Sequence, residues 1–223
     1  MHYTKNMMFR KNLLAISYSV TALCFAIGAY FLPQAPERFA THWNADGVAD
    51  GFSSPAFGLF LIPIVSLVVL GLYSIFRKID PLKQNIAASQ PAADGVLFVV
   101  VLFLSYLQGM VVYWNKVGPF AFNRVIAPAF GTLFFCVGLM MRMTKRNWFI
   151  GIRTPWTLSS DTVWQKTHAI GGVLFMGIGA ASGVIGMLLP GIFIWLLLFP
   201  LIGSTIFLFF YSYFIYRKEK DGQ

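Results

Sequence analysis

The sequence predicts an all-α integral membrane protein that crosses the bilayer six times. Three observations support this prediction: a mean hydropathy of +0.69, a charged fraction of only 11%, and six apolar runs that lack Asp, Glu, Lys and Arg. The runs contain 17 to 25 residues, and about 20 helical residues span the hydrocarbon core of a bilayer. Strands of a membrane barrel would instead alternate polar and apolar residues. The runs are Leu13–Leu32, Phe57–Phe76, Val96–Trp114, Val125–Met141, Ala169–Leu189 and Ile192–Tyr216.

The first run follows a basic stretch, as the apolar core of a signal peptide would. Its 20 residues exceed the usual length of such a core, and the following "LPQAPERF" offers no clean small-residue cleavage site. We therefore expect an uncleaved membrane helix. Cys24 and Cys136 fall inside apolar runs, where we expect small buried side chains and no disulfide.

The distribution of basic residues predicts that both termini are cytoplasmic. Of the 17 Lys and Arg residues, 14 fall in segments on one side of the predicted bilayer, and only Arg38, Lys116 and Arg124 fall on the other. Cytoplasmic loops carry the excess of positive charge. The net charge of +9 then suits the anionic inner leaflet of the lipid bilayer, and we expect no direct binding of nucleic acid. The 14 are Lys5, Arg10, Lys11, Arg77, Lys78, Lys83, Arg142, Lys145, Arg146, Arg153, Lys166, Arg217, Lys218 and Lys220.

The connections between the runs differ in length. An outer loop (33–56), an inner loop (77–95) and a long inner loop (142–168) are expected, and Pro190-Gly191 makes a minimal turn between the last two helices. We predict two segments: 1–95, with two helices and the outer loop, and 96–223, with four helices and the long inner loop. Small residues crowd the fifth run, including Gly179 and Gly183. They indicate either close packing within the bundle, which we favour, or a dimerisation face.

The outer loop predicts a hairpin-like structure. Its two Asp-Gly pairs, Asp46-Gly47 and Asp50-Gly51, are strong turn signals. His42, Asp46 and Asp50 are possible metal ligands, but their spacing matches no zinc-type pattern and no cysteine joins them. We expect them to cap turns and to form a polar lid over the outer ends of the helices, without a metal.

The long inner loop contains "NWFIGIRTPWTLSSDTVWQKTH" (147–168), which holds three of the six tryptophans. Ser159 or Ser160 is a suitable N-cap for the next helix, and Asp161 in its first turn suits the helix dipole. We expect Arg153 to pair with Asp161 or to bind phosphate, and the tryptophans to lie at headgroup depth. The segment is interpreted either as a membrane anchor with a helix cap or as a docking surface.

This inner segment resembles the signature of the SdpI family of bacteriocin-immunity membrane proteins, whose core reads N-x-x-I-G-[IL]-R-T-P-W-T-L and is followed by a V-W pair. The outer "LPQAPERFATHWNADGVADGFSSP" is similar to a small domain of unknown function that often precedes this signature. The inner candidates for a docking or structural role are Asn147, Gly151, Arg153, Thr154, Pro155, Trp156, Asp161, Trp164 and His168. The candidate toxin-facing residues of the outer loop are Pro36, His42, Trp43, Asn44, Gly47, Asp50 and Gly51.

The resemblance implies protection of the cell from a secreted, membrane-active toxin peptide. It also implies a signalling role in which the toxin-bound protein holds a cytoplasmic autorepressor at the membrane. The alternative is an exporter of a neutral or lipid-like substrate, with Gln108 and Asn115 as its polar lining, since charged residues of ion pathways are absent from the six runs. An enzyme is not expected, because no G-x-S-x-G or H-E-x-x-H motif occurs. No cofactor is expected, and the sequence leaves the identity of the toxin and the oligomeric state open.

Overall fold

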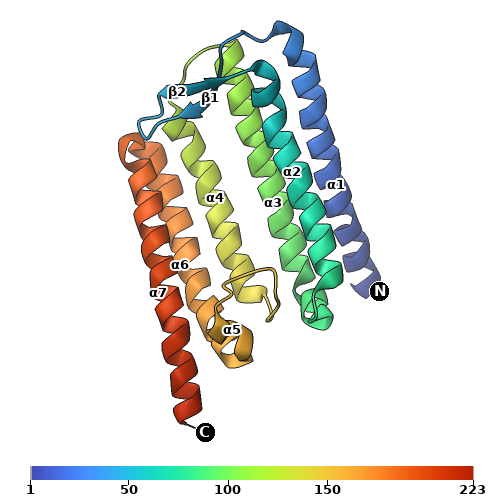
Figure 1. Cartoon of the computed structure of the whole chain (residues 1–223), viewed down its shortest axis with the longest axis vertical. Helices are drawn as coiled ribbons and strands as arrows, with labels where there is room; N and C mark the ends of the chain where they lie inside the picture. The colour runs from blue at the N-terminus through green and yellow to red at the C-terminus, as the bar shows by residue number, and fades with distance from the viewer. Residues whose placement is uncertain (1, 223) are drawn as a thin grey trace.

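Six long helices make up most of the part of the chain that the structure describes, and Figure 1 shows how they are arranged. The computed structural model describes residues 2–222, with the side chains of residues 13–222 apart from 83 and 86. Within this range six helices are long and apolar enough to cross a membrane, so the all-α, six-span prediction is confirmed. They are α1 (His2–Phe31), α2 (Pro55–Ile79), α3 (Lys83–Lys116), α4 (Phe122–Met143), α6 (Asp161–Leu188) and α7 (Phe193–Asp221). The short elements are η1 (Leu32–Gln34), β1 (Phe39–Trp43), β2 (Ala49–Ser53), α5 (Pro155–Ser159) and η2 (Pro190–Ile192).

The helices form two groups of three, as Figure 1 shows. Helices α1, α2 and α3 pack against one another, α6 packs against both α4 and α7, and contacts between α3 and α4 join the groups. Leu70, Leu97 and Val101 form a buried cluster in the first group. Met110 of α3 meets Phe193 of α7 in a second cluster, which lies across the junction. Lipid is as apolar as these side chains, so close packing rather than water exclusion holds such helices together.

Glycines bring α4 and α6 close together. A Cβ atom added to Gly131 would lie 2.6 Å from the Cα of Gly183 and 2.7 Å from the carbonyl oxygen of Gly179. A Cβ atom added to Gly138 would likewise lie 2.6 Å from the carbonyl oxygen of Gly172. The small residues of α6 therefore serve packing within the bundle, which confirms the interpretation favoured by the sequence. Cys24 and Cys136 are free thiols, as expected.

The prediction of an inner loop over residues 77–95 was wrong. Helix α2 ends at Ile79 and α3 begins at Lys83, so the connection is three residues long. The sequence between Lys83 and the apolar run is rich in Ala and Gln, which favour helix even where hydropathy is low. The proposed division at residue 95 lies within α3 and stays a prediction.

The bundle has two different ends. Residues 32–54, 117–121 and 190–192 form the hairpin end, and residues 80–82 and 144–160 form the terminus end, where both chain termini lie (Figure 1). The cytoplasmic orientation of the terminus end stays a prediction. Of the basic residues assigned to it, Lys5, Arg10, Lys11 and Lys83 lie outside the residues whose side chains are described.

The outer loop folds into a two-stranded antiparallel hairpin, in which Phe39 pairs with Ser53 and Ala40 with Phe52. The Asp46-Gly47 pair lies in the turn, where Gly47 has a φ of 76°, so this turn prediction is confirmed. The second pair was assigned wrongly: Asp50-Gly51 lies within β2. Gly51 pairs there with His42 beside an irregularity in register, so the second Asp-Gly signal marks a distorted strand rather than a turn.

Candidate functional site

The inner motif begins with a turn built around Asn147, which is 1% exposed. Its Oδ1 accepts hydrogen bonds from the backbone N–H groups of Phe149 (2.9 Å) and Ile150 (2.7 Å). Its Nδ2 donates to the carbonyls of Lys145 and Ile150, both at 3.0 Å. Asn side chains stabilise turns in this way because they reach nearby backbone groups. Asn147 therefore folds the chain as it leaves α4.

A buried carboxylate attaches this turn to the α2–α3 connection. Asp80 is 0% exposed. Its Oδ1 accepts from the N–H of Leu82 at 2.6 Å, and its Oδ2 accepts from the N–H of Trp148 at 2.9 Å. A buried carboxylate is tolerated where donors satisfy it, so Asp80 joins the two halves of the chain at the terminus end.

Helix α3 adds two further links to the same turn. Asn85 Nδ2 donates to the carbonyl of Arg146 at 2.9 Å, and Ser89 Oγ accepts from the N–H of Lys145 at 2.7 Å. The turn is thus fixed to α3 by backbone groups on both sides of the bond between Lys145 and Arg146.

Gly151, Trp164 and His168 form a compact unit behind the turn. The indole and imidazole rings stack with centroids 3.9 Å apart, and Ile152 N–H donates to His168 Nε2 at 2.9 Å. Nε2 is therefore an acceptor, so His168 is neutral and its Nδ1–H donates to the carbonyl of Trp164 at 2.8 Å. Gly151, with a φ of 113°, lies against the edge of this imidazole.

Trp164 faces neither solvent nor lipid, and its expected position at headgroup depth stays a prediction. The side chain is 1% exposed, and its Nε1–H donates to the carbonyl of Thr144 at 2.9 Å. The i, i+4 face that it shares with His168 points into the protein, because Gly151 leaves room for the rings there. Trp148 is the exposed tryptophan of the motif, with half of its surface accessible.

The Thr-Pro-Trp part of the motif builds α5 and attaches it to α7. Thr154 caps α5 in a capping box with Thr157, and Pro155 occupies the first turn. The hydroxyls of Thr154 and Ser212 share a hydrogen bond of 3.0 Å. Trp156 packs against the ring of Phe209, with centroids 5.1 Å apart. The motif therefore holds the C-terminal half of α7 in place.

Of the two expectations for Arg153, the pairing with Asp161 was wrong, whereas the binding of phosphate stays a prediction. Arg146 binds Asp161, with Nε 2.8 Å from Oδ1, and also donates from Nη1 to the carbonyl of Leu158 at 2.7 Å. Arg153 is exposed and donates to the carbonyl of Trp148 at 3.0 Å. The turn at Asn147 brings the earlier arginine, not the later one, to the start of α6.

Ser160 is the N-cap of α6, which confirms one of the two expected candidates, Ser159 and Ser160. Its Oγ accepts from the N–H of Val163 at 3.2 Å and donates to Glu219 of α7 at 2.7 Å. Ser159 instead donates to the carbonyl of Pro155. Asp161 follows in the first turn of α6, as expected from its favourable position in the helix dipole.

At the hairpin end, two asparagines hold the hairpin to the helices. Asn115 of α3 accepts from the N–H of Ala40 at 2.7 Å and donates to its carbonyl at 3.0 Å, replacing a strand partner. Asn123 of α4 donates to the carbonyls of Ala45 (2.7 Å) and Pro190 (3.4 Å). The hairpin thus contacts both groups of helices.

The aromatic side of the hairpin rests on α3 and α4. Trp43 stacks on Phe122 with centroids 4.5 Å apart and meets Trp114 edge-on at 5.5 Å. Its buried Nε1–H has no hydrogen-bond partner among the described residues. Asn44 closes the turn beyond it by accepting from the N–H groups of Asp46 and Val48.

The three metal-ligand candidates do not come together. His42 Nδ1 lies 2.6 Å from Asp50 Oδ1 across the hairpin, and both side chains are largely exposed. Asp46 lies on the turn, and no group of three His, Cys, Asp or Glu residues placed to hold a metal occurs in the part of the chain that the structure describes.

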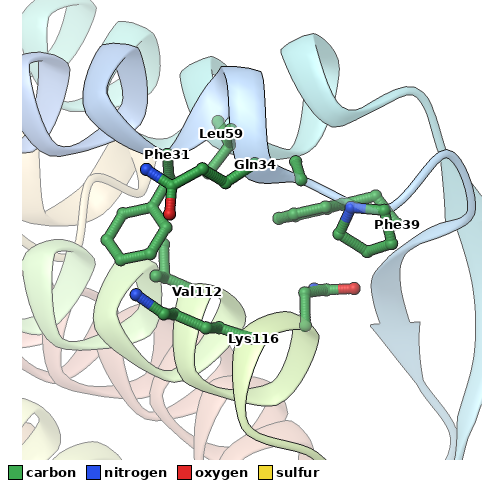
Figure 2. Close-up of a pocket in the computed structure, with 9 residues that line it drawn as sticks. Phe31, Gln34, Phe39, Leu59, Val112 and Lys116 are labelled. Atoms are coloured by element: carbon green, nitrogen blue, oxygen red, sulfur yellow. The ribbon is translucent and has the colours of Figure 1, made fainter.

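Two hollows open at the hairpin end. A pocket of about 60 Å³ lies beneath β1, lined by Pro36 and Phe39. Figure 2 shows Phe31 and Gln34 opposite Val112 and Lys116 of α3 across it. A cleft of about 480 Å³ lies between the hairpin turn and the connections α3–α4 and α6–α7. Its lining residues are Asp46, Gly47, Val48, Ala49, Trp114, Pro119, Phe120, Ala121, Phe122, Asn123, Pro190 and Gly191.

Comparison with known proteins agrees with the resemblance noted in the motifs. Residues 144–212 match the SdpI/YfhL protein family, and residues 20–67 match a domain of unknown function, DUF1648. The chain is 27% identical over 215 residues to the Immunity protein SdpI of Bacillus subtilis (strain 168), covering 94% of this chain and 97% of that protein. No solved structure matches. With six helices able to span a bilayer, this chain is a multi-pass protein of the cell membrane.

Each matched region includes the longest connecting segment of one end of the bundle. The SdpI match begins at Thr144, where the inner turn begins, and continues through α5 and α6 into α7. The DUF1648 match runs from α1 through the hairpin into α2. Sequence reasoning missed the partners that hold these motifs, because they lie 56 to 78 residues away along the chain. These partners are Asp80, Asn85, Ser89, Asn115 and Asn123.

Proposed function

We propose that this chain is an immunity protein that protects its cell from a secreted, membrane-active toxin peptide. The observation that carries the proposal is the similarity to the Immunity protein SdpI, which extends over nearly the whole of both chains. The exporter alternative is not favoured. The residues expected to line an export path are engaged in structural bonds: Gln108 Nε2 donates to the carbonyl of Leu59 at 2.9 Å, and Asn115 holds β1.

Protection is tested in a toxin-sensitive bacterial host that carries this chain. Survival is measured against a panel of purified, secreted antibacterial peptides, with an empty vector and an abundance-matched unrelated six-helix membrane protein as controls. We expect protection against at least one membrane-active peptide and unchanged sensitivity to antibiotics with intracellular targets. Equal killing of the three strains by every peptide would refute the proposal.

We propose that the hairpin end faces outward, so that it meets the toxin first. Support comes from the charge bias, with 14 basic residues on the terminus side and three on the hairpin side. Cysteines at Ala45 and Gly191 should react with an impermeant maleimide in intact cells, after Ala replaces Cys24 and Cys136. The cytoplasmic control is exposed Gln84, because Ser89 is buried and bonded to Lys145. Labelling of Gln84→Cys in intact cells, before lysis, would show that the terminus end faces outward and that the proposed orientation is wrong.

A cytoplasmic repressor, if it is a partner, would meet the terminus end. We propose Trp148 and Arg153 as its contact residues, since both side chains are exposed beside the ordered turn. The test follows induction of the chain's own operon, survival and membrane abundance in Trp148→Ala and Arg153→Ala. Loss of induction with survival and abundance intact would support docking. Unchanged induction in both variants would remove this face as the docking site.

A further inference from the structure

We propose that the cleft at the hairpin end binds an apolar segment of a cationic peptide, and that Asp46 faces the positive charge of that peptide. The inference rests on the proposed immunity function, because it supplies the binding site for the toxin class named there. The cleft has a volume of about 480 Å³, within the roughly 300–1,000 Å³ typical of ligand sites. The smaller pocket beneath β1, at about 60 Å³, holds only about two waters at roughly 30 Å³ each.

The walls of the cleft are largely apolar and come from both matched regions and from residues 114–123 between them. Trp114, Phe120 and Phe122 supply aromatic surface, and Pro119 and Pro190 fix the two connections that border it. Aromatic side chains give large contact area at low conformational cost. The cleft therefore suits bulky apolar side chains of a peptide.

The cleft is held open by contacts that already exist. Asn123 bonds the hairpin turn at Ala45 on one side and reaches the carbonyl of Pro190 on the other. Trp43 stacks on Phe122 beneath the turn. Because these groups are ordered before binding, little conformational freedom is lost when a ligand enters.

The negative charge of Asp46 favours a positively charged peptide as the occupant of the cleft. The carboxylate of Asp46 is exposed and makes no hydrogen bond or ion pair with any described residue, whereas Asp50 on the same hairpin binds His42. The backbone N–H of Asp46 donates to Asn44 at 3.0 Å, which fixes the backbone of this residue where it lines the cleft. A lysine, arginine or terminal ammonium of a bound peptide would be its partner.

The surroundings of the cleft indicate a ligand that approaches along the membrane. Large apolar side chains are exposed at the neighbouring helix ends, including Val117, Leu189 and Ile192. An amphipathic cationic peptide lies in the interface with its apolar face buried to this depth. The proposed occupant is therefore a membrane-active peptide rather than a hydrophilic protein domain.

The first test fills the cleft. Gly191 lines it, and a Cβ atom added there would meet no other atom within 4 Å, so Gly191→Trp introduces an indole at the cleft without a clash at its Cβ. The control is Gly203→Trp, at a position on α7 that also has open space but lies outside the cleft. Against a peptide from which the parent chain protects, Gly191→Trp should lower the tolerated dose about tenfold, the effect of losing one central contact. Equal protection by both variants at equal abundance would overturn the cleft while leaving immunity in place.

The second test removes the charge. Asp46→Asn should reduce protection about threefold to fivefold, as for a partly exposed ion pair. Glu37→Gln, at another exposed acid of the outer loop, should leave protection unchanged. If both variants lose protection equally, or both keep it, the proposed role of Asp46 is overturned.

The third test does not depend on protection. Bimane is attached to Val48→Cys in the cleft wall or to Ala56→Cys outside the cleft, in the background that lacks Cys24 and Cys136. The probe is a synthetic peptide of leucine and tryptophan with one lysine, added to the protein in phosphatidylcholine nanodiscs. The tryptophan of the peptide should quench the Val48 label at least threefold more than the Ala56 label. A peptide with glutamate in place of the lysine should quench the Val48 label less. Equal quenching of both labels would overturn the cleft; selective quenching without any protection in cells would instead refute immunity alone.

Discussion

Asparagines hold both ends of the bundle together, but the two ends differ in how their acidic residues are buried and paired. At the terminus end Asp80, Asn147 and His168 are buried, and hydrogen bonds satisfy them on both sides. At the hairpin end Asp46 is exposed and unpaired, and the N–H of Trp43 has no partner among the described residues. A buried, satisfied network fixes one arrangement of the chain. The difference teaches that the inner motif forms a structural joint. In the outer loop, the carboxylate of Asp46 bonds no described residue, and this is the group that we propose for a peptide partner.

This contrast predicts where the protein tolerates change. The inner joint connects the α2–α3 connection, the turn after α4, and the start of α6 through Asp80, Asn147 and Trp164. Loss of one member leaves others buried without partners, which costs more than the bond itself is worth. The hairpin end contains fewer such dependencies. Matched substitutions at the two ends therefore test the comparison directly.

The largest effect is expected from Asp80→Ala. Two backbone N–H groups, of Leu82 and Trp148, would lose their acceptor inside the protein, at a cost of about 4 kcal/mol in total. Asp50→Ala at the hairpin end removes only an exposed pair with His42, worth less than about 1 kcal/mol. Thermal unfolding in detergent and abundance in the membrane should show collapse for Asp80→Ala and near-parent values for Asp50→Ala. Equal melting temperatures would break the comparison.

The next largest loss of stability is expected from Gly151→Ala. A φ of 113° disfavours any side chain, and the added Cβ would meet the imidazole of His168, for a combined cost of about 3 kcal/mol. Its counterpart, Gly47→Ala, has a φ of 76° and only tight contacts with Asn123 at 3.2 Å, for about 1 kcal/mol. The melting temperature should be highest for the parent, lower for Gly47→Ala and lowest for Gly151→Ala. The reverse order would mean that the hairpin turn, not the inner turn, is the stricter joint.

How far the sequence could predict this structure depends on the range of the interactions. The six spans were predictable because hydropathy sums over about 20 neighbouring residues, and the cap at Ser160 and the turn at Gly47 are local signals. The partner of Asp161 was not predictable: Arg146 and Arg153 both precede it closely, and the choice depends on the turn at Asn147. Asp80 lies 68 residues from the N–H group that it accepts from. No local pattern marks such a pair.

A third comparison uses two tryptophans. Trp164→Phe keeps most of the ring packing but removes the donor to the carbonyl of Thr144, which should cost about 1–2 kcal/mol. Trp43→Phe removes an N–H without a described partner, so stability should stay equal or rise slightly. Chemical unfolding in mild detergent measures both. A larger loss for Trp43→Phe would show that its N–H has a partner, such as a bound water, and that the hairpin end is more ordered than its free groups indicate.

The smallest effect separates two arginines of the inner motif. Arg146 binds the carboxylate of Asp161 and the carbonyl of Leu158 at once, and Lys has no planar fork to replace both bonds. Arg146→Lys should therefore lower the free energy of unfolding by about 1 kcal/mol. Arg153→Lys, at an exposed side chain that bonds only the carbonyl of Trp148 among the described residues, should change it by less than about 0.5 kcal/mol. The measurement is a pair of melting curves together with operon induction. If Arg153→Lys melts like the parent but loses induction, Arg153 acts on a partner, and this exposed part of the terminus end is a functional surface on a structural joint. If it melts as early as Arg146→Lys, Arg153 belongs to the joint itself, and the assignment of a docking role to it fails.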